Sequence, residues 1–399
     1  MGNQLTNKQL FHNYLGQTSA FPMGVEVSRA ENIYLYGPDG KKYIDLISGI
    51  AVSTLGHNYP KIVQAVKDQA EKHMHVMVYG EFVQSPQVQL AGAIAGTLPE
   101  KLDNVFFVNS GSEAIEGAMK LAKRYTGRPK IIACKNAYHG ATHGALSLSS
   151  EEIFKQAFMP LLPGIGHIHH GRELDLDQID DDTAAVVIEP VQGEGGIRIA
   201  SADYFKKLRK KCDETGALLV FDEIQTGFGR TGKFWALEHF GVVPDIVTTA
   251  KGMGGGMPLG AFISSREIMS ALQANPVLGH ITTFGGHPVS CAASLATLNV
   301  LQETKIFELA DEKADLFKIY LKHEKIKEIR NLGLMMAVQF DSFDQVQRII
   351  HKCTELGLIT DWFLFCDDAI RIAPPLIITD EQIKEACDIL IQAIDSSLS

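Results

Sequence analysis

Short apolar runs alternate with segments of helical periodicity between about residue 100 and about residue 265. One helix is expected at 112–125, where Ile115, Met119 and Ala122 recur on one face, and another around 202–214. The apolar runs between them are expected to be strands, at 105–108, 131–134, 184–188, 217–221 and 245–250. Continuous apolar strands between amphipathic helices are typical of a mostly parallel sheet covered on both faces, so this region predicts an α/β fold.

The two ends of the chain follow a different pattern. Two alternating apolar runs within 31–45 flank Pro38-Asp39-Gly40, which predicts a hairpin, and a helix is expected at 60–72 with Ile62, Val63, Val66 and Ala70 on one face. After residue 295 we expect a helix to about residue 320, strands at 334–340, 358–365 and 370–373, a helix at 342–356 and a last helix from Thr379. This mixed arrangement predicts a second, smaller α+β domain.

The composition excludes several classes of protein. The 399 residues are 45% hydrophobic and carry a formal net charge of −10 with no basic block, which argues against binding nucleic acid or an anionic membrane. No apolar run approaches the length of a transmembrane helix. The start Met1-Gly2 followed by Thr6 matches a myristoylation pattern, but no polybasic segment follows it, so we expect no lipid anchor and no contact with a membrane.

Cysteine and histidine spacing predicts neither disulfides nor a metal site. The six cysteines are scattered, and none forms a Cys-x-x-Cys pair, so we expect them to be buried in a reducing cytoplasm. His167, His169 and His170 have no acidic or cysteine partner at ligand spacing, so no metal is predicted there.

A lysine stands at the end of the last apolar run of the α/β region. Lys251 follows 245–250 directly, and glycines 252, 254, 255 and 256 come just behind it. Burial at the end of a strand lowers the pKa of a lysine, and the neutral amine is then able to form a Schiff base. The other interpretation of this stretch alone is a surface lysine that opens a flexible loop.

Two further motifs lie at strand ends. Asn109-Ser110-Gly111-Ser112-Glu113 joins a strand to a helix, and Ser110 with Glu113 fits a capping box. The other N–H groups of this helix start could hold a phosphate, although a plain cap explains the motif equally well. Asp222 ends a core strand, where ligands bind in open α/β sheets, and it could partner a protonated ring nitrogen or simply cap a loop. A phosphate seat, a carboxylate and a Schiff-base lysine together are what pyridoxal 5'-phosphate requires.

A competing motif follows Asp222. The stretch 227–233 nearly matches the phosphate loop of nucleotidases, but Phe234 occupies the place of the hydroxyl that would hold magnesium. No helix is expected directly after it. A P-loop nucleotidase therefore remains as a remote alternative, beside a non-catalytic scaffold protein.

The long motifs resemble those of the class III pyridoxal-phosphate aminotransferases, the family of ornithine, acetylornithine and 4-aminobutyrate aminotransferases. The resemblance runs from 49–57 to Ala373-Pro374-Pro375 and is strongest over 221–232, followed by Lys251. It implies the type I aminotransferase fold, with a large domain around a mostly parallel sheet of the seven-stranded type and a small α+β domain built from both termini. The implied division is 1–54 for the N-terminal segment of the small domain, 55–294 for the large cofactor-binding domain and 295–399 for the C-terminal small domain.

The resemblance also implies roles for individual residues. Lys251 is similar to the lysine that forms the aldimine, Asp222 to the partner of the pyridinium nitrogen, and Thr283 to a phosphate ligand given by the other subunit of an obligate homodimer. Glu194 lies in a stretch that resembles the one beside the substrate, and Arg371 resembles the arginine that binds the substrate carboxylate. The implied cofactor-binding set also includes the phosphate loop, the aromatic residue on the ring face and Gln225 near the ring hydroxyl; it is Ser110, Gly111, Ser112, Tyr138, His139, Glu189, Asp222, Gln225, Lys251 and Thr283.

The implied activity is transfer of an amino group from an ω-amino acid or terminal amine to a keto acid, 2-oxoglutarate or pyruvate, by a ping-pong mechanism in the cytoplasm. An aminomutase or a decarboxylase on the same scaffold is the nearer alternative. One position departs from the family: relatives that use ornithine, acetylornithine or 4-aminobutyrate commonly carry an arginine where this chain has Ala141. The departure leaves the identity of the amino donor open.

Overall fold

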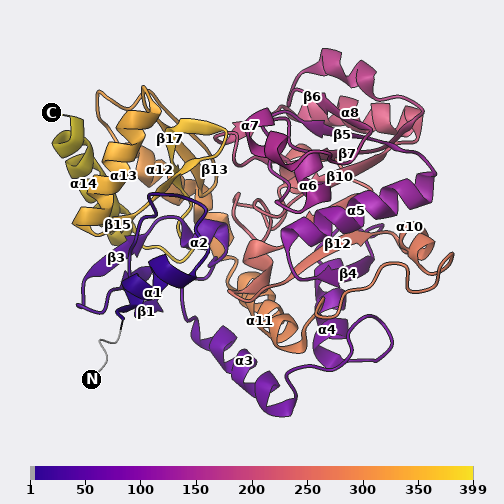
Figure 1. Cartoon of the computed structure of the whole chain (residues 1–399), viewed down its shortest axis with the longest axis horizontal. Helices are drawn as coiled ribbons and strands as arrows, with labels where there is room; N and C mark the ends of the chain where they lie inside the picture. Colours follow the sequence, from indigo (N-terminus) through magenta and orange to yellow (C-terminus); the bar gives the residue numbers. More distant parts are fainter. Residues whose placement is uncertain (1–4, 399) are drawn as a thin grey trace.

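The computed structural model describes residues 5–398, so the Met-Gly start of the myristoylation pattern lies outside the described residues. Its largest sheet has seven strands in the order β4-β12-β11-β10-β7-β5-β6 and lies to the right in Figure 1. The strands are β4 (Asn104–Val108), β5 (Lys130–Cys134), β6 (Ile165–Ile168), β7 (Thr183–Ile188), β10 (Leu218–Asp222), β11 (Ile246–Thr249) and β12 (Gly260–Ser264). Only β12 runs antiparallel to its neighbours, which confirms the prediction of a mostly parallel sheet.

Apolar side chains fill both faces of this sheet. Successive strand residues point to opposite faces, so Ile131 belongs to one buried cluster and Ile132 to the other. The first cluster includes the apolar stripe of α5, and the second includes the inner face of α8. The helices of this region are α3 (Pro60–Lys72), α4 (Ser85–Ala95), α5 (Gly111–Thr126), α6 (His143–Ser147), α7 (Glu152–Lys155), α8 (Ala202–Thr215), α9 (Leu237–Phe240), α10 (Arg266–Met269) and α11 (Pro288–Thr304).

Strands from both ends of the chain form two smaller sheets, at the left of Figure 1. In one of them the expected hairpin is present, and β15 from the C-terminal part pairs in parallel with β3, with Leu358 opposite Ile44. Its strands are β1 (Arg29–Glu31), β2 (Tyr34–Tyr36), β3 (Lys42–Asp45) and β15 (Leu358–Ile359). The other has the order β13-β14-β17-β16, from β13 (Glu328–Leu332), β14 (Met335–Gln339), β16 (Asp361–Phe363) and β17 (Cys366–Ile372). A short pair, β8 (Val191–Gln192) and β9 (Arg198–Ile199), lies beside the large sheet's strand ends.

The remaining helices cover these sheets or stand at the N-terminus. They are α1 (Asn7–Tyr14), α2 (Ser48–Ala51), α12 (Ala310–Tyr320), α13 (Phe343–Leu356) and α14 (Asp380–Leu398). Within residues 5–398, no helix is long and apolar enough to cross a membrane. The division into 1–54, 55–294 and 295–399 stays a prediction.

Some expected elements differ from the structure. The helix expected up to residue 320 is two helices, because Lys305 takes a left-handed conformation (φ 47°) that ends α11. The strand expected at 358–365 is broken between β15 and β16, at Thr360, whose hydroxyl donates to the carbonyl of Arg371. On α3 the face is also shifted, since Ala70 is exposed and Gln69 is buried with its amide bonded to the carbonyl of His73.

Candidate active site

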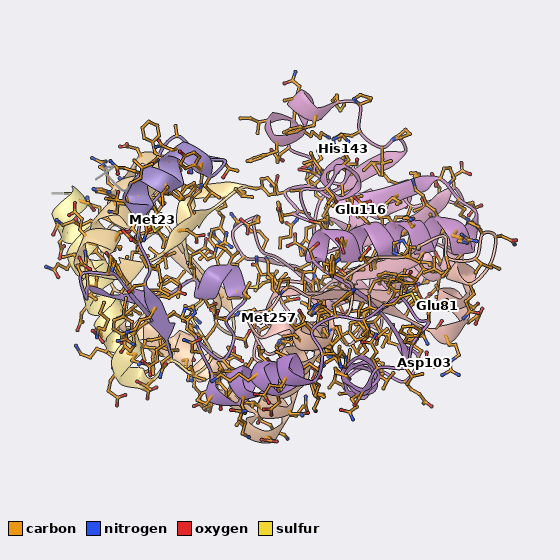
Figure 2. The ribbon with its side chains drawn as sticks, turned by 60° about the horizontal axis from the view of Figure 1, so that its bottom comes forward. Met23, Glu81, Asp103, Glu116, His143 and Met257 are labelled. Atoms are coloured by element: carbon orange, nitrogen blue, oxygen red, sulfur yellow. The ribbon has the colours of Figure 1, made fainter. Side chains whose placement is uncertain are left out.

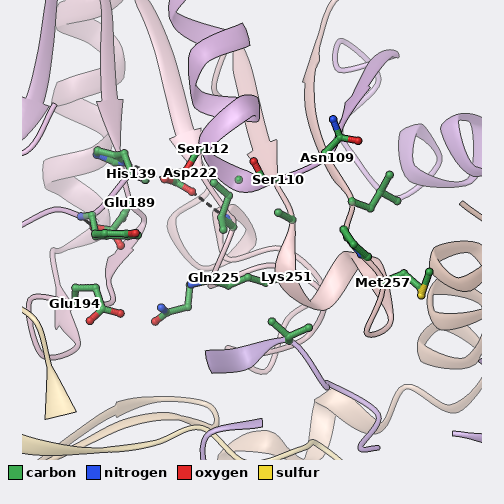
Figure 3. A pocket seen from close by; sticks show the side chains of 18 of the residues that line it. Asn109, Ser110, Ser112, His139, Glu189, Glu194, Asp222, Gln225, Lys251 and Met257 are labelled. Atoms are coloured by element: carbon green, nitrogen blue, oxygen red, sulfur yellow. Dashed lines mark hydrogen bonds and ion pairs between the residues drawn. The ribbon is translucent and has the colours of Figure 1, made fainter. Parts of the chain in front are cut away.

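A cavity of about 400 Å³ opens at the carboxyl ends of the central strands, where ligands bind in open α/β sheets. Figure 3 shows it from close by, and Figure 2 shows one of its lining residues, Met257, near the middle of the molecule. It is the larger of two cavities that share lining residues, and we call it the larger cavity. It brings together most of the site residues predicted from the sequence, namely Ser110, Gly111, Ser112, Tyr138, His139, Glu189, Glu194, Asp222, Gln225 and Lys251.

A second cavity of about 330 Å³, called the adjoining cavity, shares Tyr138, Glu194 and Lys251 with the larger one. Arg371 lines the adjoining cavity rather than the larger one. Thr283 lies in neither cavity of the single chain and is exposed. The structure therefore joins all the predicted residues except Thr283 into one continuous site.

Lys251 is buried at the edge of the sheet and has a strained backbone conformation. It follows β11 after one residue and has φ 47°, a left-handed conformation that non-glycine residues rarely adopt. Such strained residues concentrate at functional sites. Burial lowers the pKa of the Lys251 amine, while the charge of Glu194 opposes that shift. The site thus favours the neutral, nucleophilic amine.

Asp222 ends β10, next to β11 in the sheet, and is buried. One carboxylate oxygen accepts from the N–H of Ile224 at 3.0 Å, and the other lies 2.7 Å from Nδ1 of His139. Burial lowers the pKa of His139, but its hydrogen bond and charge interaction with Asp222 more than offset this, so the pKa is raised. His139 therefore holds the Asp222 carboxylate in place, and Nε2 of His139 has no hydrogen-bond partner within the described chain.

The start of α5 forms one wall of the larger cavity. The hydroxyl of Ser110 accepts from the N–H of Glu113 at 3.2 Å, as predicted. The capping box is incomplete, however, because the Glu113 carboxylate accepts from the N–H of Asn109 at 2.8 Å instead of from that of Ser110. The first N–H groups of a helix have no acceptor inside it, so those of Gly111 and Ser112 are available to an anion in the cavity.

The loop that carries Tyr138 is tied to this helix. Ser112 Oγ accepts from the N–H of Ala141 at 3.2 Å, and Gly140 has φ 132°. A Cβ at Gly140 would lie 2.2 Å from Ser112 Oγ, so only glycine fits between the loop and the helix. Further along, the Glu116 carboxylate of α5 accepts from the N–H groups that open α6, and Glu116 lies close to His143 in Figure 2.

Glu189 closes the back of the larger cavity from the end of β7. Burial raises its pKa to about 7. Its carboxylate accepts from the N–H of Gly193 at 3.0 Å and from that of Tyr138 at 3.3 Å. Glu189 thereby fixes the stretch that leads to Glu194 relative to the Tyr138 loop, while Gln225 lines the cavity from the segment after β10.

Arg371 sits on β17 with two carboxylates against it. Nη2 lies 2.8 Å from Oε2 of Glu194, and Nε lies 3.1 Å from Oδ1 of Asp361. The guanidinium also lies over the ring of Phe363, with Cζ 4.7 Å from the centroid. Glu194 and Arg371 were both expected beside the substrate, and the structure brings them into contact; Asp361 was not expected.

Several lining residues were missed from the sequence. In the adjoining cavity these are Ile50, Asp361, Trp362 and Leu364. Ile50 lies in a left-handed turn with φ 63°, a conformation that an isoleucine does not predict. Asp361 and Trp362 lie in the stretch expected as one continuous strand, and only the pairing of Asp361 opposite Arg371 reveals their position.

The competing phosphate-loop motif has a structural role. Arg230, inside it, is buried and donates to the carbonyls of Leu334 and Pro374. Lys233 is exposed, and the short helix α9 begins only at Leu237. The motif thus connects the central sheet to the C-terminal part of the chain and offers no helix start to a nucleotide phosphate.

The residues of the larger cavity fit pyridoxal 5'-phosphate. A buried amine of lowered pKa, an aspartate in contact with a histidine, and the open N-terminus of a sixteen-residue helix lie around one cavity. When bound, this cofactor supplies an electron-withdrawing ring that stabilises negative charge on the substrate carbon. Lys251 would hold its aldehyde carbon, Asp222 its ring nitrogen and the start of α5 its phosphate.

Comparison with known proteins defines the class. The sequence profile of the family described as "Aminotransferase class-III" matches residues 16–394, and the chain belongs to this family. It is 39% identical over 396 residues to the acetylornithine aminotransferase of Methanopyrus kandleri, which covers 98% of this chain and 99% of that one. It is 40% identical to the acetylornithine aminotransferase of Caldanaerobacter subterraneus, with 91% and 92% covered.

Solved structures agree with this assignment. The ornithine aminotransferase of Toxoplasma gondii superposes with a TM-score of 0.90 at 30% identity, covering 97% of this chain and 93% of that one. An amine transaminase from an uncultivated Pseudomonas species, in its PLP-bound form, gives 0.88 at 26% identity, with 96% and 98% covered. The type I fold is confirmed. The chain is an aminotransferase that uses pyridoxal 5'-phosphate, and its family supports transfer of an ω-amino group.

Proposed function

We propose that this enzyme moves the amino group of an ω-amino acid or terminal amine to 2-oxoglutarate or pyruvate, in two half-reactions of a ping-pong cycle. The observation that supports this most is the continuity of the two cavities: Lys251 and Tyr138 line both, with Asp222 on one side and Arg371 on the other. One substrate can therefore reach the amine of Lys251 while its far end lies near Arg371.

We assign the catalytic roles to two residues. The neutral amine of Lys251 would hold the cofactor and would take and deliver the proton at the substrate carbon. The carboxylate of Asp222 would hold the proton on the ring nitrogen of the bound cofactor, because a negative partner favours the charged form of the ring. Ser110, Gly111 and Ser112 would hold the phosphate, and the ring would be oriented by other lining residues, namely Tyr138, His139, Glu189 and Gln225.

The contact between Glu194 and Arg371 is closed in one half-reaction and open in the other. The pair is closed in this structure, with the carboxylate masking Nη2 of the arginine. Closed, it suits an amine substrate; with Glu194 withdrawn, Arg371 is free for the carboxylate of a keto acid. Burial raises the pKa of Glu194, but the charge and hydrogen bond of Arg371 outweigh burial and lower it overall, so the pair is ionic at neutral pH.

The test is a panel of amino donors, each run with 2-oxoglutarate and with pyruvate. Turnover with ω-amines and one of these acceptors, in a protein that absorbs in the visible through its cofactor, is the expected result. A coloured protein that turns over none of the panel with either acceptor would contradict the proposal.

We also propose that the enzyme is a homodimer of the cytoplasm whose site is completed by Thr283 of each partner. Exposure of Thr283 outside both cavities of its own chain supports this, and the six free, buried cysteines are consistent with a reducing compartment. Mixing Lys251→Ala protomers with Thr283→Ala protomers should place both changes in one site of a mixed dimer and leave the other intact. Mixtures no more active than either parent would contradict the shared site.

A further inference from the structure

The adjoining cavity holds more negative than positive charge beside its arginine. Arg371, Glu194 and Asp361 have side chains that are only 5%, 7% and 17% exposed. Two carboxylates and one guanidinium leave one negative charge in excess. Since all three are shielded from bulk water, this excess acts more strongly on a ligand than surface charges do.

Asp361 is fixed in place by the sheet. It pairs directly opposite Arg371 between β16 and β17, so its backbone is held in a strand and not in a loop. Burial raises the pKa of Asp361 to about 6, although Arg371 opposes the shift. Above that pH the carboxylate is ionised, and it stays so whether or not Glu194 is in contact with Arg371.

The contact between Asp361 and Arg371 leaves hydrogen-bonding capacity unused. Asp361 Oδ1 and Arg371 Nε lie 3.1 Å apart, yet within the described chain neither atom makes a well-aligned hydrogen bond. Arg371 Nη1 is also buried without a partner there. Buried polar atoms are almost always paired in native structures, so these atoms are poised for a ligand. Asp361 can accept from a cation, and Nη1 remains for the carboxylate of the keto acid.

The other walls of the adjoining cavity suit a methylene chain. Ile50, Trp362 and Leu364 line it, and Tyr138 and Lys251 line both this cavity and the larger one. A chain with an amine at the Lys251 end would pass these apolar groups and finish near the two carboxylates. A cationic far end would meet attraction there, and a carboxylate far end would meet repulsion from Asp361.

We infer that Asp361 selects amino donors that carry a second cationic group at their far end, the α,ω-diamines, over ω-amino acids of the same length. The inference rests on the proposed function and narrows its donor class. Asp361 acts on substrate choice, not on the chemical step.

The test compares two donors that differ only at the far end, 1,5-diaminopentane and 5-aminopentanoate. In the wild type we expect a higher kcat/KM for the diamine. Asp361→Asn removes the charge and keeps the shape, and should shift the ratio of the two kcat/KM values at least ~10-fold towards the amino acid. Asp367→Asn is the matched control, because Asp367 is an exposed carboxylate at the start of the neighbouring strand, and it should leave the ratio unchanged.

A binding measurement separates this inference from the proposed function. Glutarate, an unreactive dicarboxylate, should bind several-fold more tightly to Asp361→Asn than to the wild type in calorimetric titrations of the holoenzyme. A wild type that prefers 5-aminopentanoate, or a ratio unmoved by Asp361→Asn, overturns the inference while the transaminase assignment stands. If neither donor is turned over, the glutarate titration decides: an unchanged Kd overturns the role of Asp361.

Discussion

The two cavities of this aminotransferase hold their charges in opposite ways. In the larger cavity two polar groups are held by neighbours in the same wall: Asp222 by His139, and the α5 start by its own serine cap. In the adjoining cavity the charged groups contact one another, as Glu194 and Asp361 do with Arg371. Groups supported from behind stay preorganised for a permanent cofactor, whereas groups paired across a cavity can exchange partners when substrates alternate.

The largest effect is expected in the larger cavity, at Lys251. Lys251→Ala removes the only side chain that can both hold the cofactor's aldehyde carbon and move the substrate proton in our proposal. We expect loss of the visible absorbance band of the bound cofactor and a fall in kcat of at least ~10⁴-fold, since general-base catalysis alone contributes ~10²–10⁴. Exposed Lys233→Ala should change neither. Full turnover by a folded Lys251→Ala protein would sink the assignment.

Asp222→Asn should give the next largest loss. The variant keeps the shape of the side chain and its contact with the backbone of Ile224, so the cofactor should still bind. A charge-assisted hydrogen bond is worth ~1.5–3 kcal/mol, and its electrostatic effect in the transition state adds to this, so the rate should fall at least ~100-fold. Single-turnover kinetics with one amine would measure it. A change of less than a few-fold would mean that another group protonates the ring.

The same contrast explains what could be predicted from sequence. Three groups of the larger cavity stand at a recognisable strand end or helix start: Asp222 and Lys251 each follow an apolar run, and Ser110 precedes a helix. The other predicted residues of this cavity, among them Tyr138, Glu189 and Gln225, were found through family resemblance. Five strands of the large sheet and its mostly parallel arrangement follow from the same runs, whereas β6 and β12 were not expected. Local pattern carries this information because strand ends in a parallel sheet meet at one edge.

The adjoining cavity could be predicted only in part, because its residues meet through pairing between distant segments. Asp361 is brought beside Arg371 by the register of β16 and β17, and β15 separates from β16 where the hydroxyl of Thr360 bonds to a carbonyl. Neither event has a local signal in an apolar stretch. Arg371 and Glu194 themselves were found through family resemblance, not through periodicity.

Arg371→Ala tests the adjoining cavity as a switch between substrates. The keto-acid half-reaction should lose ~10–100-fold, the worth of a bidentate arginine–carboxylate contact of ~1.5–3 kcal/mol, while the amine half-reaction changes little. Stopped-flow absorbance of the bound cofactor follows each half separately. Arg330→Ala is a useful control, since Arg330 is on the same sheet, donates to the carbonyl of Gly196 and lies outside both cavities. Equal losses in both halves would argue against the switch.

The smallest effect is expected at Ala141, where a substitution tests whether the far end of the amino donor contacts a positive charge. Relatives that bind a remote carboxylate commonly place an arginine here, whereas this chain has a methyl group on an exposed loop residue next to Gly140, which lines the larger cavity. Three other arginines that could supply the charge are held elsewhere, since Arg230, Arg124 and Arg198 donate to the carbonyls of Pro374, Asn275 and Gly195. None of them lines either cavity.

The missing contact should weaken recognition of a remote carboxylate by ~10–100-fold, at about 1.4 kcal/mol per factor of ten. The measurement is the ratio of kcat/KM for 4-aminobutyrate to that for a neutral amine of similar length. We expect the wild type to favour the neutral amine and Ala141→Arg to move the ratio towards the acid, with Ala141→Gln as a control for side-chain size. A wild type that strongly prefers 4-aminobutyrate would show that a cation other than Arg124, Arg198 and Arg230 binds the far end of the donor.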